Sequence, residues 1–117
     1  MSEISHRAFL GDAERDFSLG SKQLRALEDV TEVGLGALYQ RLIRGEFRFT
    51  DLTEVIRHGL IGGGASTSEA ENMIRHWVLD RPIAETYPLA LDILDRRWNG
   101  APVEAVEQSN PPEGDDW

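Results

Sequence analysis

The chain's carboxylate and imidazole side chains are the residues that could bind a metal ion. Glu54 and His58 are four residues apart, which places both on one face of a helix and offers two ligands. The other histidines, His6 and His76, stand far away in sequence and beside arginines. A pair without a third ligand is more typical of a contact between neighbouring helical side chains. We therefore predict no metal site.

Two glycine-rich segments have the composition of nucleotide-binding loops. The segment 59–67 reads Gly-Leu-Ile-Gly-Gly-Gly-Ala-Ser-Thr, but it contains no lysine and follows a predicted helix instead of a strand. Gly34-Leu35-Gly36 lacks the third glycine and the preceding strand of a dinucleotide fingerprint. A helix stop followed by a flexible loop explains the first segment, and a loosely packed helix start explains the second. No cofactor or small-molecule substrate is predicted.

Acidic residues near the C-terminal end raise the possibility of paired-carboxylate catalysis, at Asp80, Glu85, Asp92 and Asp95. Such catalysis needs two acids that converge on one pocket in different environments. Asp92 and Asp95 instead fall on the polar side of a helix, opposite the apolar face of Leu91, Leu94 and Trp98. The chain also has no Gly-x-Ser-x-Gly nucleophile motif. We predict no catalytic residues and no enzymatic activity.

Composition indicates one soluble domain. The 117 residues are 40% apolar and 28% charged, and the net charge of −9 disfavours both nucleic acid and anionic membrane surfaces as partners. The chain has no cysteine, and neither an export signal nor a membrane-spanning stretch is visible. Cytoplasmic localisation is expected.

The N-terminal residues 4–19 favour a β-hairpin. Short apolar pieces flank Gly11-Asp12, which is a good turn and a poor helix interior. The alternative is an amphipathic helix through Ala8 to Phe17.

Helical periodicity and stop signals then predict a series of short helices. The first is capped by Ser18 or Ser21, runs for about two turns and ends near Thr31. The second starts near Gly34 and stops at Gly45, and the third is capped by Thr50 and ends at residues 62–64. The strongest local signal is Ser66-Thr67-Ser68-Glu69, a capping box that starts a helix extending to about Val78.

Two prolines complicate the last helical region. Either one helix kinks at Pro88 or a new helix starts there, with Tyr87, Leu91, Leu94 and Trp98 as its buried face in both cases. Residues 101–117 are rich in proline and contain five carboxylates but no basic residue. We predict a single domain over residues 1–100 and a disordered acidic tail over 101–117. The expected fold is α+β and mainly α, a β-hairpin followed by four or five short helices in a compact bundle.

The order of several short segments resembles the gene-transfer-agent family of phage tail assembly chaperones, which is also labelled a tail tube family. The segments are Leu24-Arg25-Ala26-Leu27-Glu28, then Gly45-Glu46-Phe47 before Thr50, then 55–64, then Thr67-Ser68-Glu69-Ala70-Glu71, and finally the leucine-rich stretch 90–98. The resemblance covers most of residues 4–100. It departs at Asp80-Arg81-Pro82 and at Tyr87-Pro88, which replace the family's more usual turn.

The resemblance implies a protein that acts in the bacterial host cell, where it binds and shields the tape-measure protein, or other tail proteins, during tail assembly. The alternative is that the protein is a structural component of a phage-like particle, such as a tube or connector subunit. A regulatory module such as an acidic antitoxin or a DNA mimic is supported only by the net charge. No oligomeric state follows from the sequence.

The predicted protein-binding surface is the edge of the second and third helices, around Tyr39, Ile43, Phe47 and Phe49. These apolar residues exceed what one narrow buried stripe requires. The alternative is that they belong to the core.

Overall fold

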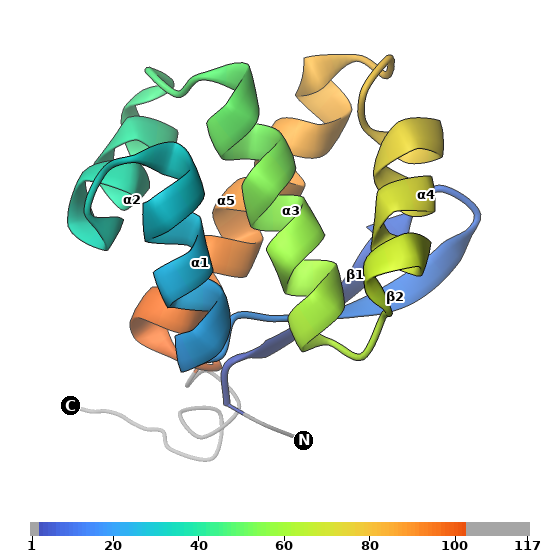
Figure 1. Ribbon diagram of the computed structural model, residues 1–117, viewed down its shortest axis with the longest axis horizontal. Helices are drawn as coiled ribbons and strands as arrows, with labels where there is room; N and C mark the ends of the chain where they lie inside the picture. The colour runs from blue at the N-terminus through green and yellow to red at the C-terminus, as the bar shows by residue number, and fades with distance from the viewer. Residues whose placement is uncertain (1–2, 103–117) are drawn as a thin grey trace, which may run out of the picture.

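The computed structural model describes residues 3–102, which form a two-stranded antiparallel sheet and five helices (Figure 1). The elements are β1 (Ser5–Leu10), β2 (Ala13–Ser18), α1 (Ser21–Thr31), α2 (Leu35–Arg44), α3 (Phe49–Gly62), α4 (Thr67–Trp77) and α5 (Ile83–Asn99). The predicted fold class is confirmed, with five helices after the hairpin.

The hairpin closes through a two-residue turn at Gly11-Asp12. Its register runs from Leu10 opposite Ala13 to Ser5 opposite Ser18. Gly11 has a φ of 70°, a conformation that suits glycine at the first central position of a hairpin turn. The ring of Trp77 lies over this turn, where a Cβ on Gly11 would come within 2.3 Å of it. The helical alternative for residues 8–17 is therefore wrong.

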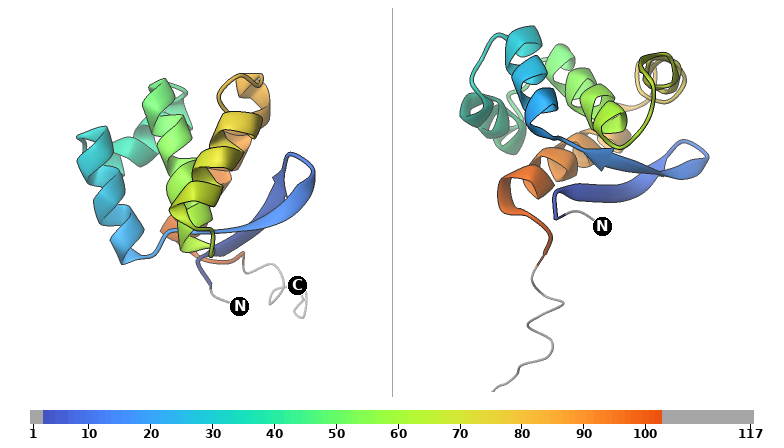
Figure 2. Two further views of the ribbon diagram at one scale, coloured as in Figure 1. Left: turned by 45° about the vertical axis from the view of Figure 1, so that its right-hand side comes forward. Right: turned by 60° about the horizontal axis from the view of Figure 1, so that its bottom comes forward.

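Helix α3 is the centre of the fold. It contacts β2, α1, α4 and α5, so that the other elements surround it (Figures 1 and 2). The fully buried core side chains come from β2 and from all five helices, and they include Phe17, Leu27, Leu42, Ile56, Ile74, Ile93 and Leu94. Burial of this apolar face is the main stabilising contribution to the domain.

The C-terminal end of α3 packs directly on the backbone of β2. A Cβ built on Gly62 would lie 1.8 Å from the carbonyl oxygen of Ser18, and one on Gly63 would lie 2.0 Å from that of Asp16. As predicted, the helix ends in this glycine segment. The segment is also a close contact between a helix end and a strand, which the sequence analysis did not foresee.

Two predicted stop and start signals are confirmed. Gly45 ends α2 in the left-handed conformation with a φ of 72°. Ser66 caps α4: its hydroxyl accepts from the Glu69 amide at 3.1 Å, while the Glu69 carboxylate accepts from the Ser66 amide at 2.8 Å.

Two predicted N-caps are wrong. Helix α1 starts after Gly20, whose amide donates to the Gln23 side chain at 3.0 Å, so neither Ser18 nor Ser21 caps it. The helix is also longer than predicted, at 11 residues. In α3, Thr50 lies inside the first turn and the cap residue is Arg48. In both helices a side chain three residues downstream supplies the cap acceptor.

Helix α5 is continuous through Pro88, so no new helix starts there. Its buried residues are Thr86, Leu89, Ala90, Ile93 and Leu94. Of the predicted face, Leu94 is buried and Tyr87 and Leu91 are partly buried, whereas Trp98 is 52% exposed. The prediction failed at Trp98 because its ring stacks on Tyr39 at the edge of the core instead of entering it.

The last turns of α5 form hydrogen bonds with the backbone of the N-terminal segment. The Arg96 guanidinium donates to the Ser5 carbonyl, and Arg97 Nε donates to the Leu19 carbonyl at 2.7 Å. The two ends of the described chain are thus tied together by side chain to backbone hydrogen bonds. Within residues 3–102, none of the helices combines the length and the apolar character needed to cross a membrane. The predicted acidic tail, apart from its first two residues, lies outside the described part of the chain.

Candidate protein-binding surface

The four predicted binding residues lie at the end of α2 and the start of α3, and they divide into two kinds. Ile43 and Phe49 are 49% and 46% exposed. Tyr39 is buried at 8% exposure, and Phe47 is partly buried against the core. The structure therefore leaves two of the four exposed, and the other two belong to the core or pack against it.

Phe47 is held by an aromatic stack. Its ring lies 4.9 Å from that of Tyr87, with an interplanar angle of 12°, and the Tyr87 hydroxyl donates to the Leu42 carbonyl at the end of α2. Offset stacking of this kind adds roughly 1 kcal/mol to the burial itself. The link between α2 and α3 is consequently fixed to α5, which gives the exposed Ile43 and Phe49 a rigid base.

A buried carboxylate fixes the same corner. The Asp51 side chain is fully buried and accepts from the Arg48 amide at 2.8 Å and from the Arg41 guanidinium at 3.1 Å. Arg48 also donates to the carbonyl of Thr31 at the end of α1. A buried carboxylate needs such charged donors, because an unpaired one is strongly unfavourable. One side chain thus joins the ends of α1 and α2 to the start of α3.

Tyr39 connects α2 to the last turns of α5. Its ring stacks on Trp98 at a centroid distance of 4.4 Å, and its hydroxyl donates to Asp95. This hydrogen bond is the main reason that the pKa of Tyr39 is raised above its ordinary value. Tyr39 thus has a structural role between α2 and α5.

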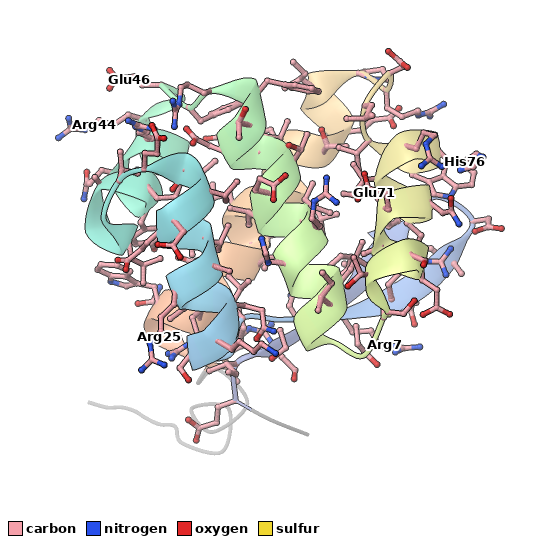
Figure 3. All side chains as sticks on the ribbon, viewed as in Figure 1. Arg7, Arg25, Arg44, Glu46, Glu71 and His76 are labelled. Carbon is pink, nitrogen blue, oxygen red and sulfur yellow. The ribbon has the colours of Figure 1, made fainter. Side chains whose placement is uncertain are left out.

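Charged side chains flank the exposed apolar pair. Arg44 and Glu46 project outward from the end of α2 (Figure 3). We call the group formed by Ile43, Phe49 and the flanking Arg44 the α2–α3 surface. An exposed apolar pair with charged neighbours has the layout of a small protein contact region.

A second group of exposed apolar residues lies at the hairpin tip and the α4–α5 connection, and sequence reasoning missed it. Phe9, Leu79 and Ile83 are 68%, 41% and 51% exposed. Beside them is a pocket of about 180 Å³ lined in part by Phe9, Trp77 and Leu89. The available signal was the strand alternation, since Phe9 shares the outer face of β1 with Arg7.

The residues considered for chemistry are engaged in ion pairs and hydrogen bonds. Glu54 lies 3.4 Å from His58 and 3.2 Å from Arg57, and Arg57 also pairs with Glu71 of α4. The imidazole of His58 lowers the pKa of Glu54 below its ordinary value, with a further contribution from Arg57. Among residues 3–102, no three potential ligands come close enough to hold a metal ion.

The C-terminal carboxylates do not converge with a partner acid in an enclosed site. Glu85 pairs with Arg81 at 3.1 Å on the surface, and Asp95 accepts from Tyr39 and from Asn99. Asp92 and Asp95 line an open hollow of about 560 Å³ together with His6. Burial, and then the charge of Arg96, lowers the pKa of His6. This arrangement couples β1 to α5 electrostatically.

The comparisons identify the kind of protein. Residues 3–100 match a family model of phage tail proteins. The family is described as phage tail tube protein, GTA-gp10, and the chain belongs to it. No curated protein and no solved structure matches the chain. The resemblance drawn from the order of the short sequence segments is thereby confirmed, and the protein is related to phage tails.

Proposed function

We propose that the protein is a tail assembly chaperone that binds the tape-measure protein and shields its apolar stripes until the tail is built. The observation that carries the proposal is the fold itself: between residues 3 and 102 the only sheet is a hairpin of two six-residue strands. A subunit that builds a tube needs longer strands to form a continuous ring of sheet. A small helical protein with exposed apolar side chains suits the holding of an amphipathic client.

The α2–α3 surface is the proposed contact region. Ile43 and Phe49 would lie against the apolar stripe of a client helix, while Tyr39 and Phe47 hold this part of the chain on the core. The stack on Tyr87 and the buried Asp51 network keep this region rigid, which reduces the entropy lost on binding. The proposed place of action is the bacterial cytoplasm, where the tape-measure protein is made.

Co-expression with the tape-measure protein tests the proposal. The full chain should keep the tape-measure protein soluble and should co-purify with it. The double variant Ile43→Ser/Phe49→Ser should lose both effects while retaining the helical signal of the wild type. The matched control is Leu79→Ser, which removes a similarly exposed apolar side chain from the second group. A tape-measure protein that is equally soluble alone would overturn the chaperone role.

A structural tail component is the second candidate, favoured by the words of the family description. It predicts that the protein remains in purified particles in a fixed ratio to the tube. A chaperone is absent from them. Immunoblotting of purified particles therefore separates the two roles.

A further inference from the structure

The outer edge of β1 carries backbone groups with no partner among residues 3–102. In a hairpin closed by a two-residue turn, Leu10 and Ala13 form a hydrogen-bonded pair, and such pairs alternate with non-bonded ones along the register. Ser5, Arg7 and Phe9 on β1 therefore direct their amide and carbonyl groups away from β2. Ser5 O accepts from Arg96, whereas the outward backbone groups of Arg7 and Phe9 form no hydrogen bond with any other part of residues 3–102.

The two edges of the hairpin are treated differently by the fold. On β2 the outward carbonyls of Asp16 and Ser18 lie directly beneath Gly62 and Gly63 of the α3 end. On β1 the segment from Arg7 to Phe9 stays on the outside of the molecule, with β2 between it and α3 (Figure 2, right). Proteins usually blunt a free edge with proline, a bulge or a covering element. Helix α5 also contacts β1, but among residues 3–102 no hydrogen bond covers the outward groups of Arg7 and Phe9, and Phe9 is 68% exposed.

The side chains on the outer face specify a register for pairing with a second copy. Arg7 is held by Glu14 at 3.1 Å and by Asp16 at 2.7 Å. If two β1 strands pair antiparallel about Ala8, Arg7 of each copy lies opposite Phe9 of the other. A row of side chains across the four strands then contains Asp16 and Arg7 of one copy followed by Phe9 and Glu14 of the other. The Arg7 guanidinium lies opposite the Phe9 ring, and no two like charges in the row are directly opposite.

A register centred on Arg7 is less favourable. It would place the two Arg7 side chains directly opposite one another, and it would pair Phe9 with Ser5, whose carbonyl is already bound to Arg96. Pairing about Ala8 instead uses all the free amide and carbonyl groups of Arg7 and Phe9 in both copies. The interface is self-complementary, as a two-fold dimer requires.

We propose that the protein forms a two-fold dimer through β1, which joins the two hairpins into one four-stranded antiparallel sheet. The partner is a second copy of this chain, and the register places Ala8 opposite Ala8 across the axis. The exposed Phe9 side chains are covered in the same step. This inference does not depend on the α2–α3 surface or on the identity of the client.

A single cysteine tests the register, because the natural chain contains none. In the proposed dimer the two residues at position 8 form a non-hydrogen-bonded pair, where Cβ atoms approach to about 4.5–5.5 Å. Ala8→Cys should therefore give a disulfide-linked dimer rapidly under mild oxidation of the full chain. Gln40→Cys, at an exposed position on α2, is the matched control and should react much more slowly.

Analytical ultracentrifugation tests the edge itself. Wild-type protein should show a concentration-dependent dimer. Phe9→Pro removes an outward amide without removing a hairpin hydrogen bond, and it should weaken the dimer about tenfold or more relative to Phe9→Val, which keeps that amide. Circular dichroism establishes whether both variants are folded. If the proline variant is unfolded, the comparison of Ala8→Cys with Gln40→Cys tests the dimer instead. A wild-type chain that stays monomeric up to millimolar concentration, or equal cross-linking of both cysteine variants, overturns the proposal.

Discussion

Substitution of Gly62 by alanine tests the close contact between α3 and β2. The added Cβ would lie 1.8 Å from the Ser18 carbonyl oxygen and 2.9 Å from its carbon, so the strand or the helix end must move. Overpacking of this kind costs typically about 1–3 kcal/mol, and the atom in the way is backbone, which cannot rotate aside. Alanine gains back roughly 0.5–1 kcal/mol of helix propensity. Because the obstructing atom is backbone, the cost lies near the upper end, about 3 kcal/mol, and subtracting the gain leaves a net loss of about 2 kcal/mol in the free energy of unfolding.

Thermal denaturation followed by circular dichroism measures the effect. For a domain of this size, 2 kcal/mol corresponds to a fall in Tm of roughly 10 °C. The control is Gly36→Ala in α2, where a Cβ meets nothing within 4 Å and the helix should be slightly stabilised. A Gly62→Ala protein that melts at or above the wild-type temperature would refute the assignment of this glycine to a strand contact.

The remaining predictions concern polar interactions. Asp51→Ala should cost about 2 kcal/mol in urea denaturation, because it removes the buried acceptor of the Arg48 amide and the Arg41 guanidinium; an unchanged stability would contradict this role. Ser66→Ala should cost about 1 kcal/mol by the same measurement, and Ser66→Asp should restore most of it. Since the folded chain lowers the pKa of Glu54, the unfolded chain binds more protons in acid. The stability from Glu54 is thus complete above its unfolded pKa and disappears as the pH falls through the folded one. Glu54→Gln should flatten that slope, and an unchanged slope would dismiss the interaction with His58.

Helix ends and turns could be predicted from the sequence where the residues that determine them lie within a few positions of one another. The Ser66–Glu69 box, the Gly45 stop and the Gly11-Asp12 turn depend only on residues a few positions apart, and all three are present in the structure. The two wrong N-caps show the limit of this reasoning. Gly20 carries no side-chain acceptor, so a search for capping hydroxyls passes over it, although Gln23 supplies the acceptor from the third helical position.

Features that depend on distant segments were not predictable. Whether Trp98 enters the core depends on where α2 places Tyr39, and the role of Gly62 depends on where β2 passes beneath it. For the predicted binding surface, the sequence named four apolar residues, and two of them, Ile43 and Phe49, are exposed in the structure. It did not distinguish the exposed Ile43 and Phe49 from Tyr39 and Phe47, because burial is decided by the packing of α5 against the end of α2.

The hydrogen bonds from Arg96 to Ser5 and from Arg97 to Leu19 have a consequence for synthesis in the cell. They join residues 91 and 78 positions apart, so the hairpin gains these contacts with α5 only after almost the whole domain has been translated. Contacts of such long range cannot stabilise a nascent chain early, and the intervening helices must wait with part of their apolar surface uncovered. We expect the packing of the domain to be completed only after its last helix has left the ribosome.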